Sequence, residues 1–130
     1  MPSVCHVITT TAFKTEAAED EETSPGRYGR AFAQFIADQL RARGEAVEAV
    51  IPEDFGWCVL LSHKPAKRFI CCGNREGCVN EWMAFAVVET GLVSRLFGSV
   101  NIDAETDRLS RMIADIVREA PGVTAYSTEQ

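Results

Sequence analysis

The residues in this chain with the clearest capacity for chemistry are its five cysteines, of which Cys71, Cys72 and Cys78 lie close together in the sequence. A structural zinc site needs four ligands, usually paired at a spacing of about two to four residues. Cys71 and Cys72 are instead neighbours in an expected strand, where successive side chains point to opposite faces. We therefore expect no metal and no other cofactor, and we interpret most of the cysteines as small buried residues.

Cys78 differs from the others because it lies in a loop over residues 73–80 that contains two glycines and Arg75. A neighbouring cation lowers the pKa of a thiol and makes it more reactive. The sequence therefore allows a small enzyme or thiol-based sensor that uses Cys78 with Arg75 and His63. The same loop lacks the Gly-Lys-Ser/Thr ending of a P-loop, although its backbone N–H groups and Arg75 could hold an anion.

Histidines and carboxylates give weaker signals. The only histidines are His6 and His63; we expect His6 to be a satisfied core or rim residue and His63 to be a polar residue at a strand end. The carboxylates of 53–54 and Glu81 precede tryptophans and could perform general acid–base catalysis. Turn capping and solvation explain these carboxylates equally well.

The acidic side chains are concentrated in one segment. Residues 15–24 contain no base and five acids, which account for five of the six net negative charges. These acids are Glu16, Glu19, Asp20, Glu21 and Glu22. We expect a mobile loop at about 14–24, which serves either as a solvated linker or to attract a basic partner through complementary charge. The chain has no clustered basic stripe, so we expect no binding to nucleic acid.

The 130 residues and the hydrophobic fraction of 46% predict one globular α+β domain over residues 1–130. No apolar run approaches the roughly 20 residues that a membrane span needs. The N-terminus does not have the basic and apolar regions of a signal peptide. An odd number of cysteines without an export signal favours reduced thiols in the cytoplasm.

The stretch from 52 to 88 predicts three consecutive antiparallel strands, at Trp57–His63, Lys67–Cys72 and Trp82–Val88. With a loop at 64–66, Leu61 would lie opposite Phe69 and Cys58 would lie opposite Cys72. One face, interpreted as core, would then carry Trp57, Val59, Leu61, Phe69 and Cys71. The other face would carry Cys58, Leu60, Ser62, Arg68, Ile70 and Cys72. A register slip of one residue would exchange the faces of one strand.

Two helices and further strands surround this region. We expect the first helix at about 25–43, with Ser24 as N-cap and Pro25 at its first position. Asp103 is expected to cap the second helix, whose apolar residues Leu109, Met112, Ile113, Ile116 and Val117 recur at helical spacing. Strands are expected at Val4–Phe13 and at Ala46–Ile51, with Pro52 closing the second. The run Val123–Ser127 allows a short final strand. The tail from Thr128 is expected to fray.

The expected order is therefore β-α-β-β-β-β-α, with a possible last strand. It predicts a two-layer α+β sandwich in which a mainly antiparallel sheet of five, possibly six, strands carries both helices on one face. The other face would show Leu60, Ile70 and Trp82 or Met83, which is more apolar surface than a monomer usually exposes. Either the segment Leu92–Phe97 or a second subunit in a homodimer would cover it.

These patterns favour a small non-catalytic binding or regulatory protein of the cytoplasm, which acts through the sheet face and the acidic loop. We expect it to form a homodimer, and one version of its function is an adaptor or a neutraliser of a basic protein partner. The binding candidates are Trp57, Trp82, Arg75, Cys78, His63, Glu19, Asp20, Glu21 and Glu22. Tryptophan is a common interaction anchor, although a tryptophan at the start of a strand is more often a core residue. A third possibility is a small-ligand pocket between sheet and helices, lined by Trp57, Phe69 and Phe85.

Overall fold

The computed structural model describes residues 4–62, 66–75, 77–89 and 102–130. Its six strands form one sheet in the order β2-β3-β4-β5-β1-β6, and every neighbouring pair is antiparallel. The strands are β1 Cys5–Thr9, β2 Val47–Glu53, β3 Gly56–Leu61, β4 Lys67–Asn74, β5 Glu81–Glu89 and β6 Ala125–Glu129. The helices are α1 Arg30–Ala42 and α3 Ile102–Arg118, and a short 3-10 helix η1 spans Glu19–Glu21.

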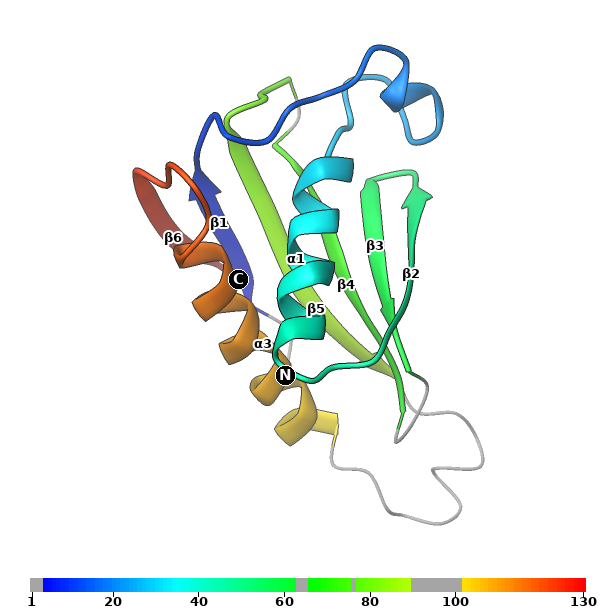
Figure 1. Cartoon of the computed structure of the whole chain (residues 1–130), viewed down its shortest axis with the longest axis vertical. Helices are drawn as coiled ribbons and strands as arrows, with labels where there is room; N and C mark the ends of the chain where they lie inside the picture. The colour runs from blue at the N-terminus through cyan, green and yellow to red at the C-terminus, as the bar shows by residue number, and fades with distance from the viewer. Residues whose placement is uncertain (1–3, 63–65, 76, 90–101) are drawn as a thin grey trace.

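Both helices lie on the same face of the sheet (Figure 1). Helix α1 packs over β2, β3 and β4, and α3 packs over β5 and β1. The predicted α+β sandwich and the predicted order of elements are confirmed, and the possible sixth strand is present as β6. Among the described residues, no helix is long and apolar enough to cross a bilayer.

The hydrophobic core lies between the helices and the sheet. Each strand contributes alternate residues to it, because side chains alternate across a strand. The largest fully buried side chains are Trp82, Phe32, Ile8, Ile36, Leu40, Leu61, Ile70, Leu109, Ile113 and Ile116. The helical stripe predicted for the last helix faces this core, except that Met112 is only partly buried at its edge.

The predicted register between β3 and β4 is wrong by one residue. Leu60 lies opposite Phe69 and Cys58 lies opposite Cys71. Because side chains alternate, this shift moves every β4 side chain to the other face. Ile70 and Cys72 therefore lie in the core, whereas Phe69 and Cys71 lie on the face away from the helices.

The edge strands also differ from expectation. Strand β2 continues through Pro52, which we expected to end it, because an edge strand tolerates a residue without an N–H donor. Strand β6 pairs with β1 as far as Glu129, so the expected fraying of the tail from Thr128 is wrong. Strand β1 is shorter than predicted and ends at Thr9; the next residue, Thr10, donates a side-chain hydrogen bond to the Pro121 carbonyl at 2.7 Å.

Helix α1 begins at Arg30, not near Ser24 and Pro25 as predicted. Its N-cap residue is Gly29, which has no side chain to bond the free N–H groups of the first turn. The carboxylate of Glu19 takes this role from another segment, because it accepts hydrogen bonds from the N–H groups of Gly29 at 2.9 Å and Arg30 at 3.1 Å. A carboxylate at this end also suits the helix dipole.

Glu19 is only 3% exposed, so the expectation that the whole acidic segment is solvated is wrong at this residue. Asp20 is also bonded within the chain, because its carboxylate accepts from the N–H of Gly26 at 3.0 Å. Glu21 and Glu22 remain exposed. The mobility of the segment stays a prediction, but part of its charge is used to hold the fold.

Helix α3 is joined to the sheet by ion pairs around the buried Arg68. The Arg68 guanidinium donates to the Glu105 carboxylate at 2.9 Å and to the Ser62 carbonyl at 3.1 Å. Hydrogen bonds from Arg108 and then from Arg68 lower the pKa of Glu105, although partial burial opposes them. Asp103 already lies within the first turn of α3, so it is not the predicted cap.

The turn between β2 and β3 approaches β4 through glycines. A Cβ added to Gly56 would lie 2.4 Å from the Cys72 carbonyl oxygen, and Gly56 has a φ of +151°. A Cβ on Gly73 would lie 3.0 Å from the Phe55 carbonyl oxygen. Side chains at these positions would push the two backbones apart.

We predict that Gly56→Ala destabilises the protein by about 2–4 kcal/mol, because it adds both backbone strain and a clash with backbone atoms. Gly77→Ala is a suitable control, because Gly77 also has positive φ, at +74°, but no atom lies within 4 Å of its added Cβ. Urea unfolding followed by circular dichroism measures both changes. Equal losses of unfolding free energy in the two variants would contradict the close approach of Gly56 to the β4 backbone.

We also predict that Glu19→Ala destabilises the protein by about 1–3 kcal/mol, because it leaves buried N–H groups at the start of α1 without acceptors. The exposed Glu21 provides the control, and Glu21→Ala should change stability by less than about 0.5 kcal/mol. The same unfolding measurement distinguishes them. If the two substitutions lower the free energy of unfolding equally, Glu19 does not stabilise the helix.

Candidate functional site

The face of the sheet that points away from α1 and α3 is the most plausible binding surface, and we call it the open face. Its side chains stand in rows across the four strands β2 to β5. One row consists of Ile51, Cys58, Cys71 and Phe85. The next row consists of Ala49, Leu60, Phe69 and Val87. Apart from Ala49, Cys58 and Cys71, the residues in these rows are large and apolar.

The apolar side chains of the open face are half-buried rather than enclosed. Along β5, residues alternate between buried positions toward the helices and half-buried positions on the open face, namely Met83, Phe85 and Val87. Leu60 and Phe69 are also half-buried. Both helices lie on the opposite face of the sheet (Figure 1), and these side chains do not belong to the core beneath them. In the described part of the chain, a continuous apolar surface therefore remains in contact with solvent.

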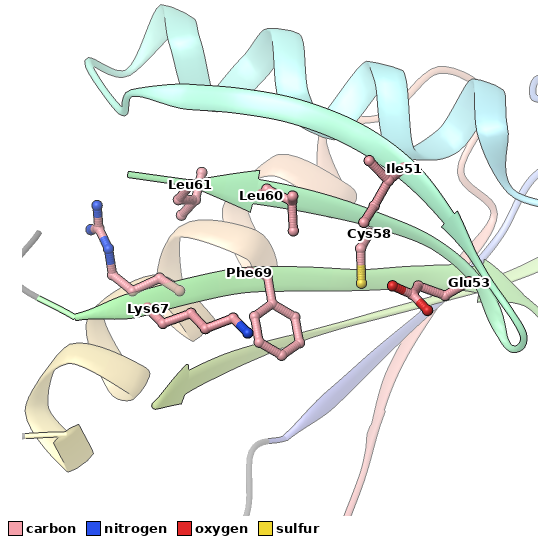
Figure 2. A pocket seen from close by; sticks show the side chains of 8 residues that line it. Ile51, Glu53, Cys58, Leu60, Leu61, Lys67 and Phe69 are labelled. Atoms are coloured by element: carbon pink, nitrogen blue, oxygen red, sulfur yellow. The ribbon is translucent and has the colours of Figure 1, made fainter. Parts of the chain in front are cut away.

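Two pockets lie side by side in this surface. The first has a volume of about 310 Å³ and is shown in Figure 2; it is lined by Ile51, Glu53, Cys58, Leu60, Leu61, Lys67, Arg68 and Phe69. The second has a volume of about 280 Å³ and is lined by Arg27, Phe55, Cys71, Cys72, Gly73, Met83 and Phe85. Each pocket could receive one or two side chains of a bound molecule.

Charged groups border the open face. Glu53 lies at the first pocket, and the Lys67 ammonium lies 5.9 Å from the centre of the Phe69 ring (Figure 2). At the other end, Arg75 binds the Glu129 carboxylate at 2.6 Å and the Glu81 carboxylate at 3.6 Å. The cation of Arg75 is thus matched by carboxylates within the chain.

The predicted tryptophan anchors are not on this surface. Trp57 is 3% exposed and Trp82 is 1% exposed, and both pack in the core. The Trp82 indole donates to the Thr10 carbonyl at 3.2 Å. The Arg30 guanidinium lies 5.3 Å from the centre of the Trp57 ring. Neither tryptophan is accessible to a partner, so this prediction is wrong.

The predicted small-ligand pocket is not formed either. Trp57 lies toward the helices, whereas Phe69 and Phe85 lie on the open face, so the three side chains are on opposite sides of the sheet. The composition of the open face was also only partly predicted. Leu60 lies there and so does Met83, but Ile70 and Trp82 face the core.

The structure does not show the predicted contact between Cys78 and Arg75. The Cys78 thiol donates to the Asn80 side-chain oxygen at 2.6 Å and lies 3.7 Å from the Glu81 carboxylate. Arg75 binds carboxylates, as described above, rather than the sulfur. His63 and the segment Leu92–Phe97 lie outside the described residues. The use of Cys78 as a reactive thiol therefore stays a prediction.

Cys58 and Cys71 form a pair of close thiols that the sequence analysis did not predict. The sulfur atoms of Cys58 and Cys71 are 3.9 Å apart across β3 and β4. A hydrogen bond between the thiols lowers the pKa of Cys58 and raises that of Cys71, which burial raises further. Sequence reasoning missed this pair because it placed Cys72 opposite Cys58.

His6 forms a second polar cluster, on the helix side of the sheet. Its Nε2 lies 2.8 Å from the Ser110 hydroxyl and its Nδ1 lies 2.8 Å from the Tyr126 hydroxyl. This matches the expectation of a satisfied histidine. The order Ser–His–Tyr resembles a nucleophile with a base, yet His6 is only 4% exposed and the two pockets described above are on the other face. We interpret the cluster as structural.

Metal binding has no candidate among the described residues, because no three His, Cys, Asp or Glu side chains there gather closely enough to hold an ion. Comparisons with known proteins do not identify a relative. The chain matches no protein-family model, and neither the curated proteins nor the solved structures give a significant match. The candidate surface must therefore be judged on its own chemistry.

We predict that His6 makes stability depend on pH. Burial, followed by the nearby charge of Arg118, lowers the pKa of His6 below its ordinary value of 6.5. The unfolded chain binds this proton first, so stability falls as the pH drops below 6.5 toward the lower folded pKa. Urea midpoints measured between about pH 7.5 and about pH 5.5 should show this loss. If His6→Phe shows the same dependence, His6 is not its source.

Proposed function

We propose that this chain is a non-catalytic binding protein whose open face receives a basic polypeptide that carries apolar side chains. The observation that supports this most directly is the continuous group of half-buried apolar side chains on β3, β4 and β5, which neither helix covers. Large exposed apolar patches on soluble proteins usually mark interaction sites. The two adjoining pockets offer positions for the partner's apolar side chains.

The charge around the face favours a basic partner. Glu53 and Glu89 are exposed at strand ends, and the chain carries a net charge of −6. Complementary charge accelerates association and rejects partners of the wrong sign. Cations also lie at the pockets, Lys67 at the first and Arg27 at the second, so we assign the selection of a basic partner to the carboxylates at the border and to the net charge.

The acidic segment adds to this border. Arg27, which follows the segment in the chain, lines the second pocket together with Phe55, so the segment ends beside the open face. Glu21 and Glu22 are exposed, whereas Glu19 is buried and Asp20 is bonded to Gly26. Within the segment, we therefore assign attraction of the partner to Glu21 and Glu22 and no longer to Glu19.

A second copy of the chain is the alternative occupant of the face, as expected from the sequence. In a twofold dimer the same surface faces itself, so the carboxylates at its border would approach one another. Like charges at an interface oppose association. We therefore favour a basic partner over a homodimer. We place this interaction in the cytoplasm, where a chain with five free cysteines keeps its thiols reduced.

The test uses a labelled amphipathic peptide of alternating lysine and leucine and a matched peptide of alternating glutamate and leucine. We predict that only the lysine peptide binds, and that added salt weakens its binding. Phe85→Ser should reduce its affinity about tenfold, because truncating an anchoring aromatic costs more than about 1 kcal/mol. Fluorescence anisotropy measures the affinity, and backbone amide NMR shifts locate the bound surface.

Val79→Ser is the matched control, because Val79 is an apolar side chain that is 52% exposed but lies in the β4–β5 loop, away from the two pockets. It should leave peptide affinity unchanged. Equal binding of the acidic peptide, or NMR shifts confined to α1 and α3, would reject the proposal. Sedimentation that shows a dimer converted to monomer by Phe85→Ser would instead establish the second copy as the occupant.

A further inference from the structure

The thiols of Cys58 and Cys71 form the closest pair of reactive groups on the open face. The two residues lie directly opposite each other on antiparallel strands, and their sulfur atoms are 3.9 Å apart. Both side chains point away from the helices (Figure 2 shows Cys58). Neither thiol has a role in the hydrophobic core that packs against α1 and α3.

We propose that Cys58 and Cys71 are a reversible modification site, at which a low-molecular-weight disulfide oxidises the two thiols to a cross-strand disulfide. The proposal goes beyond the binding function above and does not depend on it. It rests on the position of the pair, its separation and its access to a pocket.

The backbone geometry suits a disulfide. Residues directly opposite on antiparallel strands have Cα atoms about 4.5–5.5 Å apart, which is within the range that disulfides span. The sulfurs must approach from 3.9 Å to a bond length of about 2.05 Å, a movement that side-chain rotation can supply. Cys72 cannot replace Cys71, because it is 1% exposed and packs in the core on the helix side.

A small reagent can reach the pair although each side chain is only 4% or 5% exposed. Cys58 lines the pocket of about 310 Å³ and Cys71 lines the neighbouring pocket of about 280 Å³. Both pockets open on the face that the helices leave uncovered. A disulfide of a small thiol can therefore enter from the solvent.

The reaction is a balanced thiol–disulfide exchange. The Cys58 thiolate attacks one sulfur of the small disulfide, whose other sulfur leaves as a thiolate, and a mixed disulfide forms. Cys71 then attacks the Cys58 sulfur and releases the second small thiolate. The two protein thiols lose two electrons to the small disulfide, and their two protons end on the two released thiols.

The order of attack follows from the contact between the thiols. The hydrogen bond between the two thiols lowers the pKa of Cys58, so we assign the first attack to Cys58. Burial and the same hydrogen bond raise the pKa of Cys71, which suits a resolving thiol. Once Cys58 carries the small thiol, Cys71 is already beside it, so the second step is intramolecular.

The test treats the reduced full-length protein with oxidised glutathione under native conditions, blocks the remaining thiols after denaturation, and maps the peptides without reduction. We expect Cys58 and Cys71 to be joined, to lose reactivity toward iodoacetamide together, and to recover it with dithiothreitol. Cys5 and Cys78, which are half-buried and have no such partner thiol in the described structure, should carry glutathione or remain free.

Neighbouring residues give a matched pair of variants. Cys71→Ala should abolish the internal disulfide and leave Cys58 with glutathione, whereas Cys72→Ala should retain the internal disulfide. Circular dichroism checks that each variant is folded, and tandem mass spectrometry of the native chain distinguishes Cys71 from Cys72 if a variant is not. Free Cys58, or Cys58 joined to Cys72, Cys5 or Cys78 in the native chain, would overturn the proposal.

Discussion

The pairing of β3 with β4 is the constraint on which most of this structure depends. Because side chains alternate along each strand, the register decides which alternate side chains point into the core and which point to the open face. It places Ile70 and Cys72 beneath the helices, leaves Phe69 and Cys71 on the open face, and brings Cys71 opposite Cys58. It also directs Arg68 toward the helix side, where its guanidinium binds Glu105 of α3. The core, the open face and the thiol pair are therefore consequences of one hydrogen-bonded ladder.

In the acidic segment, Glu19 stabilises the fold, whereas Glu21 and Glu22 remain exposed to solvent. Glu19 lies beside the N-terminus of α1, where two backbone N–H groups need an acceptor and the dipole favours an anion. Burial of a carboxylate is tolerated there because it is fully bonded. Glu21 and Glu22 have no such constraint and stay exposed. The segment therefore caps a helix through Glu19 and presents the charges of Glu21 and Glu22 to solvent.

An apolar face, an acidic border and a close thiol pair occupy the same side of the sheet. Two helices can cover only one face of a six-stranded sheet, so the other face must be exposed, covered by further chain or bound to a partner. The proposed partner would bury the half-buried aromatic side chains of β4 and β5. Oxidation of Cys58 and Cys71 would change the chemistry at the centre of that surface while leaving the core on the other side intact.

The sequence by itself determined the element types and their order. Helical periodicity located α3, and β-branched and aromatic runs located β3, β4 and β5, because these signals lie within one element. The presence of an apolar face beyond the helices also followed from residues such as Leu60 and Met83. Local patterns did not fix the register of β3 and β4, since a one-residue slip leaves an equally apolar arrangement in a strand that is apolar on both sides.

Only the tertiary structure decided which residues of different elements contact one another. Ser24 and Pro25 are a good local start for a helix, but Glu19 supplies the cap from a segment that sequence spacing does not connect to Arg30. The tryptophans are large and could anchor a partner or a core, and only packing against α1 and α3 placed Trp57 and Trp82 inside. The pair of Cys58 and Cys71 is likewise a property of the ladder. Such contacts join residues that are far apart in the chain, so their identity is determined when the sheet and helices assemble.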